Sequence, residues 1–100
     1  MKGGRKMNCQ KETVRQHICF YGRVQGVGFR FRASQLAELI GLTGWVRNEE
    51  DYVEMEVQGN PAEIRRLIER LETGPWIEIE WYEAEEIPVE ESEWGFQVNW

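Results

Sequence analysis

The stretch YGRVQGVGFR, residues 21–30, joins a run typical of a β-strand to a run typical of an α-helix. Residues 18–21 are apolar or aromatic, and residues 31–40 carry apolar side chains at helical spacing. Three glycines lie between the two runs, at positions 22, 26 and 28. Because glycine has no Cβ, such a loop can turn successive N–H groups toward one point and form a nest for an anion. We therefore expect a strand, an anion-binding loop and a helix in that order.

The predicted helix start and one arginine support the same site. The N-terminus of a helix has N–H groups without intrahelical acceptors and carries a partial positive charge. Arg30 adds a planar guanidinium that matches the oxygens of phosphate or carboxylate. A glycine-rich loop alone is a weak signal, and this one has neither the Gly-Lys-Ser/Thr of a Walker loop nor the glycine spacing of a dinucleotide site. The segment therefore predicts a seat for a single tetrahedral anion.

Composition limits the class of protein. A chain of 100 residues, 41% hydrophobic and 30% charged, fits one soluble globular domain. No apolar run approaches the ~20 residues that cross a bilayer, so we expect no membrane partner. The net charge of −6 disfavours a nucleic-acid partner. The anion seat is locally cationic, and we expect four arginines near it: Arg23, Arg30, Arg32 and Arg47.

Cysteine and histidine content is low. Cys9 and Cys19 are too few for a disulfide scaffold, which favours a cytoplasmic protein, and we expect Cys19 to be buried. The single histidine, His17, cannot build a histidine-based metal site and is expected to be structural or on the surface. Residues 1–13 are polar and basic, without the apolar core of a secretory signal, and predict a flexible arm before a domain at 14–100.

Apolar patterning predicts the remaining elements. Strands are expected at 14–21, 43–47, 53–57, 76–87 and near 96–100, and helices at 31–40 and from Pro61 to the turn at 73–75. This order suggests an α+β, ferredoxin-like sandwich: β-α-β-β-α-β with a short fifth strand, and two helices on one face of an antiparallel sheet. In the first helix apolar residues recur at helical spacing at Phe31, Leu36, Leu39 and Ile40, with Ala33 and Ala37 between them; in the second, one face carries Ile64, Leu67, Ile68 and Leu71. Most tryptophans are expected in the core or half-buried on the sheet: Trp45, Trp76, Trp81, Trp94 and Trp100.

Two motifs together resemble one family. GRVQGVGFR at 22–30, followed by GWVRN at 44–48, is similar to the pair of motifs in acylphosphatases, and the resemblance extends over residues 14–100, including VQGNP at 57–61. It implies an enzyme that needs no metal or other cofactor. Similar segments also occur as one domain of larger carbamoyl-transfer maturation proteins, but 100 residues without Cys-X-X-Cys pairs favour the free-standing enzyme, and we expect a small monomer. Its substrate would be a small acyl phosphate, cleaved at the carboxyl-phosphate bond, with inorganic phosphate as product and competitor.

The resemblance also implies roles for individual residues. The catalytic pair would be Arg30 and Asn48, with Asn48 orienting the attacking water through its amide. The phosphoryl group would be held by the Arg30 guanidinium and by the loop N–H groups of Gln25, Gly26, Val27, Gly28, Phe29 and Arg30. A preorganised ring of donors of this kind stabilises the charge on a transferring phosphoryl group.

One departure and two alternatives remain. The family usually has a glycine between the asparagine and the next strand, whereas residues 48–53 read NEEDYV, one residue short and without glycine. Two-residue hairpin turns need positive φ, so we expect a different turn here, and the orientation of the Asn48 side chain depends on that turn. The main alternative function is a non-catalytic anion-binding module on the same fold. RNA binding is disfavoured, because VEMEV at 53–57 places acids where bases would stack.

Overall fold

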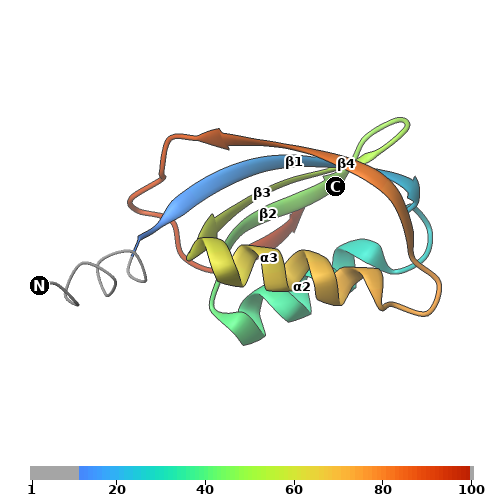
Figure 1. Cartoon of the computed structure of the whole chain (residues 1–100), viewed down its shortest axis with the longest axis horizontal. Helices are drawn as coiled ribbons and strands as arrows, with labels where there is room; N and C mark the ends of the chain where they lie inside the picture. Colours follow the sequence, from blue (N-terminus) through green and yellow to red (C-terminus); the bar gives the residue numbers. More distant parts are fainter. Residues whose placement is uncertain (1–11, 100) are drawn as a thin grey trace, which may run out of the picture.

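The computed structural model describes residues 12–99, so nearly all of the predicted arm at 1–13 lies outside the described residues. The elements follow the predicted order: β1 (Val14–Arg23), α2 (Phe29–Ile40), β2 (Thr43–Asn48), β3 (Val53–Gly59), α3 (Pro61–Glu72), β4 (Glu78–Ile87) and β5 (Phe96–Asn99). The two helices lie side by side on one face of the sheet (Figure 1). The predicted α+β, ferredoxin-like sandwich is confirmed.

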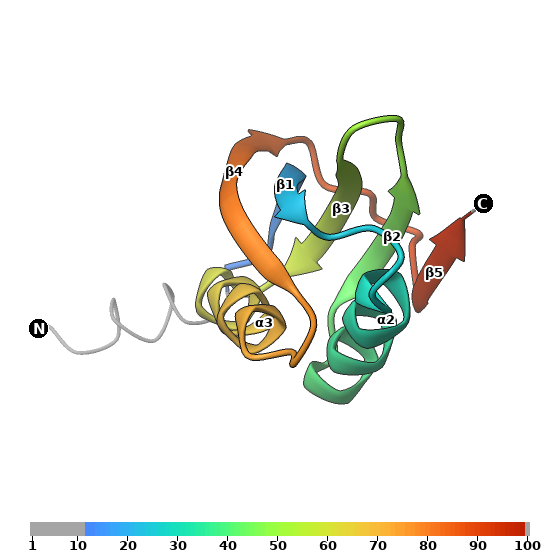
Figure 2. The ribbon, with the colours of Figure 1, turned by 90° about the vertical axis from the view of Figure 1, so that its right-hand side faces the viewer.

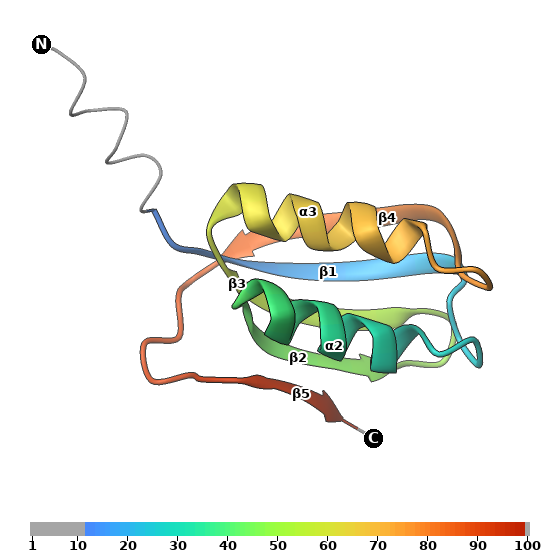
Figure 3. The ribbon, with the colours of Figure 1, turned by 90° about the horizontal axis from the view of Figure 1, so that it is seen from below.

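The sheet has the strand order β4-β1-β3-β2-β5. β1 pairs antiparallel with both β3 and β4, and β2 pairs antiparallel with β3. The short β5 pairs parallel with β2, so the sheet is antiparallel in four strands and mixed at one edge. The end-on view in Figure 2 separates the helix layer from the sheet. Figure 3, seen from the helix side, shows α3 over β4 and β1 and α2 over β2, with β5 beyond α2.

Local signals set both ends of the helices. The Asn60 side chain caps α3 by accepting a hydrogen bond from the N–H of Ala62 at 2.8 Å, and Pro61 follows at the first helical position, as predicted. Gly41 ends α2 in the left-handed region at φ 99°, also as predicted. α2 begins two residues before the predicted start, at Phe29, so the glycine loop leads directly into it.

Of the apolar residues expected in α2, the two alanines are buried and two of the large side chains are exposed. α3 buries its four predicted residues, but α2 buries Phe29, Ala33 and Ala37, while Phe31 and Leu39 are 66% and 79% exposed. Buried positions four residues apart share one face, and Phe31, two residues after Phe29, lies about 200° around the helix from it. Small alanines on the inner face let α2 approach the sheet closely. Leu36 and Ile40 are partly buried against the core.

Three of the five tryptophans do not lie where they were expected. Trp76 and Trp94 are 69% and 86% exposed, because they occupy connections rather than a sheet face. Trp81 is 52% exposed and stacks on Tyr21, with ring centroids 4.6 Å apart. Trp45 is half-buried, as expected, and Trp100 lies outside the described residues.

A β-bulge explains the position of Trp81. Tyr21 pairs with Trp81 but Gly22 pairs with Ile79, which leaves Glu80 as an extra residue in β4. The bulge breaks the predicted alternation, so Ile79 packs against the core while Trp81 lies on the face without helices. Cys19 lies two residues from Tyr21 in β1 and therefore on the same face, which the helices do not cover. Its side chain is half-buried, whereas it was expected to be buried.

Candidate active site

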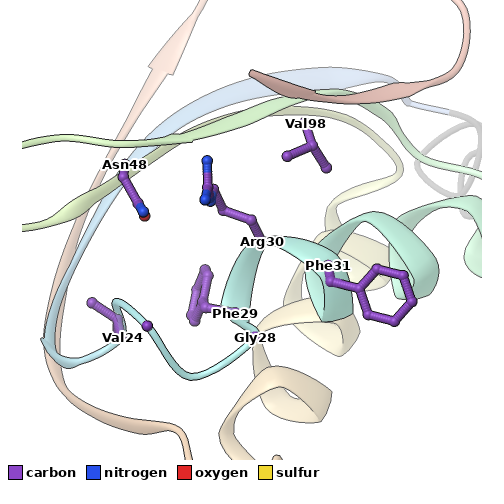
Figure 4. Close-up of a pocket in the computed structure, with 8 residues that line it drawn as sticks. Val24, Gly28, Phe29, Arg30, Phe31, Asn48 and Val98 are labelled. Carbon is purple, nitrogen blue, oxygen red and sulfur yellow. The ribbon is translucent and has the colours of Figure 1, made fainter. Parts of the chain in front are cut away.

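A pocket of about 270 Å³ lies where the glycine loop, the start of α2, the end of β2 and β5 meet (Figure 4). This volume is just below the range of ~300–1,000 Å³ typical of small-molecule sites, which suits a small ligand. Five predicted site residues line it, namely Gly26, Gly28, Phe29, Arg30 and Asn48. Gln25 and Val27 were predicted to belong to the seat but do not line the pocket. Three further residues line it that were not predicted to belong to the site: Val24, Phe31 and Val98.

The loop backbone has the conformation that an N–H nest requires. Gly26 and Gly28 lie in the left-handed region, at φ 71° and 81°. A Cβ at either position would meet nothing within 4 Å, so the backbone conformation and not crowding favours glycine there. Gly28 is also the N-cap of α2, where no side chain caps the helix and the first turn has no acidic residue. The first N–H groups of α2 therefore begin at the pocket wall without a capping side chain.

Arg30 lies between Asn48 and Val98 in the pocket (Figure 4). Its Nη1 donates a hydrogen bond to the backbone carbonyl of Asn99 in β5, at 3.1 Å. This contact spans 69 residues of sequence and orients one edge of the guanidinium. Asn99 had no sequence signal, because it acts through a backbone carbonyl that any residue would supply.

Asn48 is the last residue of β2 and pairs with Val53 in β3. Its side chain points toward Arg30 (Figure 4). The Oδ1 atom is buried and has no hydrogen-bond partner among residues 12–99. A buried acceptor without a partner costs about 1–3 kcal/mol, and such groups are retained most often where function requires them. Asn48 thus lines the pocket with a hydrogen-bond acceptor, Oδ1, that no other residue of 12–99 occupies.

The side chain of Gln25 reaches the turn between β2 and β3. Its Nε2 donates to two backbone carbonyls of that turn, those of Glu49 at 2.5 Å and Tyr52 at 2.9 Å. The turn closes on itself through a 2.8 Å hydrogen bond from the N–H of Glu49 to the carbonyl of Tyr52. The segment without glycine therefore forms a four-residue turn, in agreement with the expectation that it is not a two-residue hairpin.

Of the four arginines expected near the seat, only Arg30 lines the pocket. Arg32 donates instead to the carbonyl of Arg70 and to the Thr73 hydroxyl, at the end of α3. Arg47 lies on the face without helices, where its ion pairs with Glu54 and Glu49, at 2.9 and 2.7 Å, raise its pKa. Arg23 is exposed at the end of β1. The local positive charge of the site thus comes from one guanidinium and the helix terminus.

Other predicted sites lie apart from the pocket. His17 contacts Glu54 at 2.6 Å on the face without helices, which fits its predicted structural role. Within the part of the chain that the structure describes, no group of three or more His, Cys, Asp or Glu side chains could hold a metal ion. No helix of that part is long and apolar enough to cross a membrane.

Comparison with known proteins identifies the family of this chain. A sequence model of the acylphosphatase family matches residues 16–98. An acylphosphatase of Bifidobacterium longum is 42% identical over 85 residues, which cover 83% of this chain and 88% of the relative, and one of Thermococcus kodakarensis is 43% identical over 81 residues, 74% and 89% of the two chains. The solved structure of an acylphosphatase from Coxiella burnetii superposes with a TM-score of 0.80 at 36% identity, covering 90% of this chain and 98% of the other. The chain therefore belongs to the acylphosphatase family of enzymes.

Proposed function

We propose that this enzyme hydrolyses small acyl phosphates to a carboxylate and inorganic phosphate, with the phosphoryl group held by the loop at 22–30 and by Arg30. The observation that carries the proposal is the meeting of three kinds of donor in one small pocket: the glycine loop, the Arg30 guanidinium and the Asn48 amide. Membership of the family supports acyl phosphate hydrolysis in general, and the residue roles below are our assignment.

Phosphoryl binding follows from the charge of the group. A phosphoryl group in a loose transition state carries negative charge on its three equatorial oxygens. The loop N–H groups near Gly26 and Gly28, together with the start of α2, supply fixed donors, and Arg30 supplies a cation with paired N–H groups. Donors that are already held in place by the fold need no reorganisation during the reaction, and this is the main source of their catalytic effect.

Asn48 is assigned to the attacking water. An amide can donate through Nδ2 and accept through Oδ1, so it can orient a water molecule in two ways. The Asn48 Oδ1 is buried without a partner among residues 12–99 and lies beside Arg30, where an acceptor can align an incoming O–H. Since the leaving group is a carboxylate, which needs no protonation to depart, orientation of the water supplies the remaining requirement.

Release of phosphate from benzoyl phosphate tests the function directly. We expect hydrolysis by the wild-type protein, and in Asn48→Ala a kcat lower by about a hundredfold or more with phosphate affinity nearly unchanged. Asn60→Ala is the matched control, because Asn60 caps α3 away from the pocket and its loss should reduce stability only. A wild-type protein that binds phosphate but releases none from acyl phosphates would be the non-catalytic anion-binding module. The monomeric state and the cytoplasmic location stay predictions.

A further inference from the structure

We infer that Gln25 is a positioning residue, whose side-chain amide ties the glycine loop to the turn after β2 and so holds Asn48 in the pocket. The resemblance to acylphosphatases implies a place in the phosphoryl seat for the backbone N–H of Gln25. The partners of its side chain are a separate observation, and they connect the two motifs of the site. The inference rests on the proposed function, since it assigns Gln25 through the role of Asn48.

The contact is made by a single nitrogen that serves two carbonyls. The amide nitrogen of glutamine carries two hydrogens. The two acceptors are the Glu49 carbonyl at 2.5 Å and the Tyr52 carbonyl at 2.9 Å, which stand at the two ends of the four-residue turn. The contacts span 24 and 27 residues of sequence, so they hold together two segments that the chain connects only through α2 and β2. Gln25 therefore fixes both ends of the turn relative to the loop.

The turn needs an external contact more than an ordinary hairpin does. Residues 49–52 contain no glycine, and one internal hydrogen bond, from Glu49 to Tyr52, closes them. Asn48 directly precedes this turn, and its Oδ1 has no hydrogen-bond partner within residues 12–99 that would fix the amide. The neighbouring Arg47 is held on the opposite face by Glu49 and Glu54. On the pocket side, the position of the Asn48 backbone thus depends on its pairing with Val53 and on the amide of Gln25.

The same contact sets the spacing between the two halves of the site. Gln25 immediately precedes Gly26, whose positive φ begins the nest, so its backbone moves with the phosphoryl seat. Its side chain moves with the turn and hence with Asn48. In-line attack requires the water and the phosphorus atom to keep a fixed separation and direction, and a misplacement of 1 Å can cost about a hundredfold in rate. A contact that couples the seat to the water-orienting residue is therefore expected to act on kcat.

Gln25→Met tests the inference, because methionine keeps the length of the side chain and removes both N–H donors. We expect kcat for benzoyl phosphate to fall by about tenfold or more, while the dissociation constant for inorganic phosphate changes by less than about threefold. In an Asn48→Ala background the same change should cost almost nothing further, because residues that act through one another are not additive. Full additivity of the two losses would overturn the inference.

Gln58→Met is the matched control. Gln58 also uses its amide to hold a backbone segment, donating to the carbonyl of Glu90 at 3.0 Å and accepting from its N–H at 2.8 Å, and it contacts Arg15. This contact is remote from the pocket, so Gln58→Met should lower the melting temperature without lowering kcat. If Gln25→Met behaves in the same way, losing stability but keeping kcat, Gln25 is structural only and the inference is wrong.

Hydrogen exchange separates this inference from the proposed function. Exchange at the backbone amides of residues 49–53 should be faster in Gln25→Met than in the wild type and unchanged in Gln58→Met. Should the wild-type protein hydrolyse no acyl phosphate, the proposed function fails, and unchanged exchange at these amides would then overturn the contact itself. If Gln25→Met does not fold, Gln25→Glu, which also lacks the donors and keeps the length, replaces it in the exchange and kcat measurements.

Discussion

Arg30→Lys separates a guanidinium that binds phosphate from a cation that only adds charge. Lysine keeps the positive charge but replaces a planar fork of five donors with a compact ammonium of three. In this site the fork already has one fixed partner, since Nη1 donates to the Asn99 carbonyl in β5 at 3.1 Å. A lysine that keeps the Asn99 contact loses the paired approach to the phosphoryl oxygens, and one that turns to the phosphoryl group loses the strand that orients it.

The size of the effect follows from the contacts. A hydrogen bond to a charged group contributes about 1.5–3 kcal/mol, and removing one preorganised donor from an oxyanion site costs about 2.7–4 kcal/mol. At about 1.4 kcal/mol per factor of ten, kcat/KM for Arg30→Lys should fall by about a hundredfold to a thousandfold. The fold should persist, since Arg30 is only half-buried and contributes nothing to the apolar core.

Initial rates with benzoyl phosphate measure the change, and circular dichroism checks the fold. Arg23→Lys is the better matched control than Arg32→Lys, because Arg32 holds the end of α3 while Arg23 is exposed at the end of β1. We expect Arg23→Lys to keep the wild-type rate within about threefold. Near-wild-type rates in both variants would refute the assignment of Arg30 to the phosphoryl group.

Four further measurements test the site and the fold. Activity should survive dialysis against EDTA, and a loss that magnesium restores would contradict the assignment of the chemistry to protein donors alone. Inorganic phosphate should inhibit competitively and raise the melting temperature, with about 2.7 kcal/mol of stabilisation at a hundred times its dissociation constant. Gly22→Ala should destabilise the fold by about 3 kcal/mol or more, seen in urea unfolding, because its Cβ would lie 2.4 Å from the Glu78 carbonyl at φ 123°. Burial raises the pKa of Glu93, but hydrogen bonds from Arg15 and Thr43 outweigh burial and lower the pKa below its ordinary value of 4.5. The ionised carboxylate therefore stabilises the fold, and the free energy of unfolding should decrease as the pH falls below 4.5. This decrease should be smaller in Glu93→Gln, which has no carboxylate to protonate.

Local signals in the sequence were sufficient for most of the fold. Asn60 and Pro61 start α3, Gly41 ends α2, and the alternation at 53–57 gives a strand with three buried residues. Each depends on the chemistry of neighbouring residues and can be read from a short window. The same is true of the loop glycines and Arg30, whose place in the pocket follows from the junction of β1 and α2.

The features that the sequence did not predict depend on contacts between residues far apart in the chain. Trp81 lies on the opposite face of the sheet from the predicted one because of the bulge at Glu80. The bulge depends on the pairing of β4 with Gly22, which is more than fifty residues away in the sequence. The apolar spacing of α2 does not tell which of its residues face the sheet: Ala33 and Ala37 are buried because their small size suits close contact with it, whereas the larger Phe31 and Leu39 are exposed. Gln25 donates to the backbone carbonyls of Glu49 and Tyr52, and Arg30 donates to that of Asn99. Every residue has a backbone carbonyl, so the residue type at these positions could not predict the contacts.

The two helices within residues 12–99 start in opposite ways, and the contrast supports an anion at the start of α2. Both are twelve residues long, and α3 satisfies its first turn internally with the Asn60 cap and the acidic Glu63. α2 has a glycine in the left-handed region, no side-chain cap, no acid in its first turn and an arginine as its second residue. A cation beside the positive end of a helix is unfavourable by a few tenths of a kcal/mol or more, so this start is poor for an isolated helix. The same start becomes favourable when an anion lies between the N–H groups and Arg30, in the pocket that Asn48 also lines. Of the two helix starts described, the sequence therefore forgoes helix stability at the start of α2, where binding an anion can restore it.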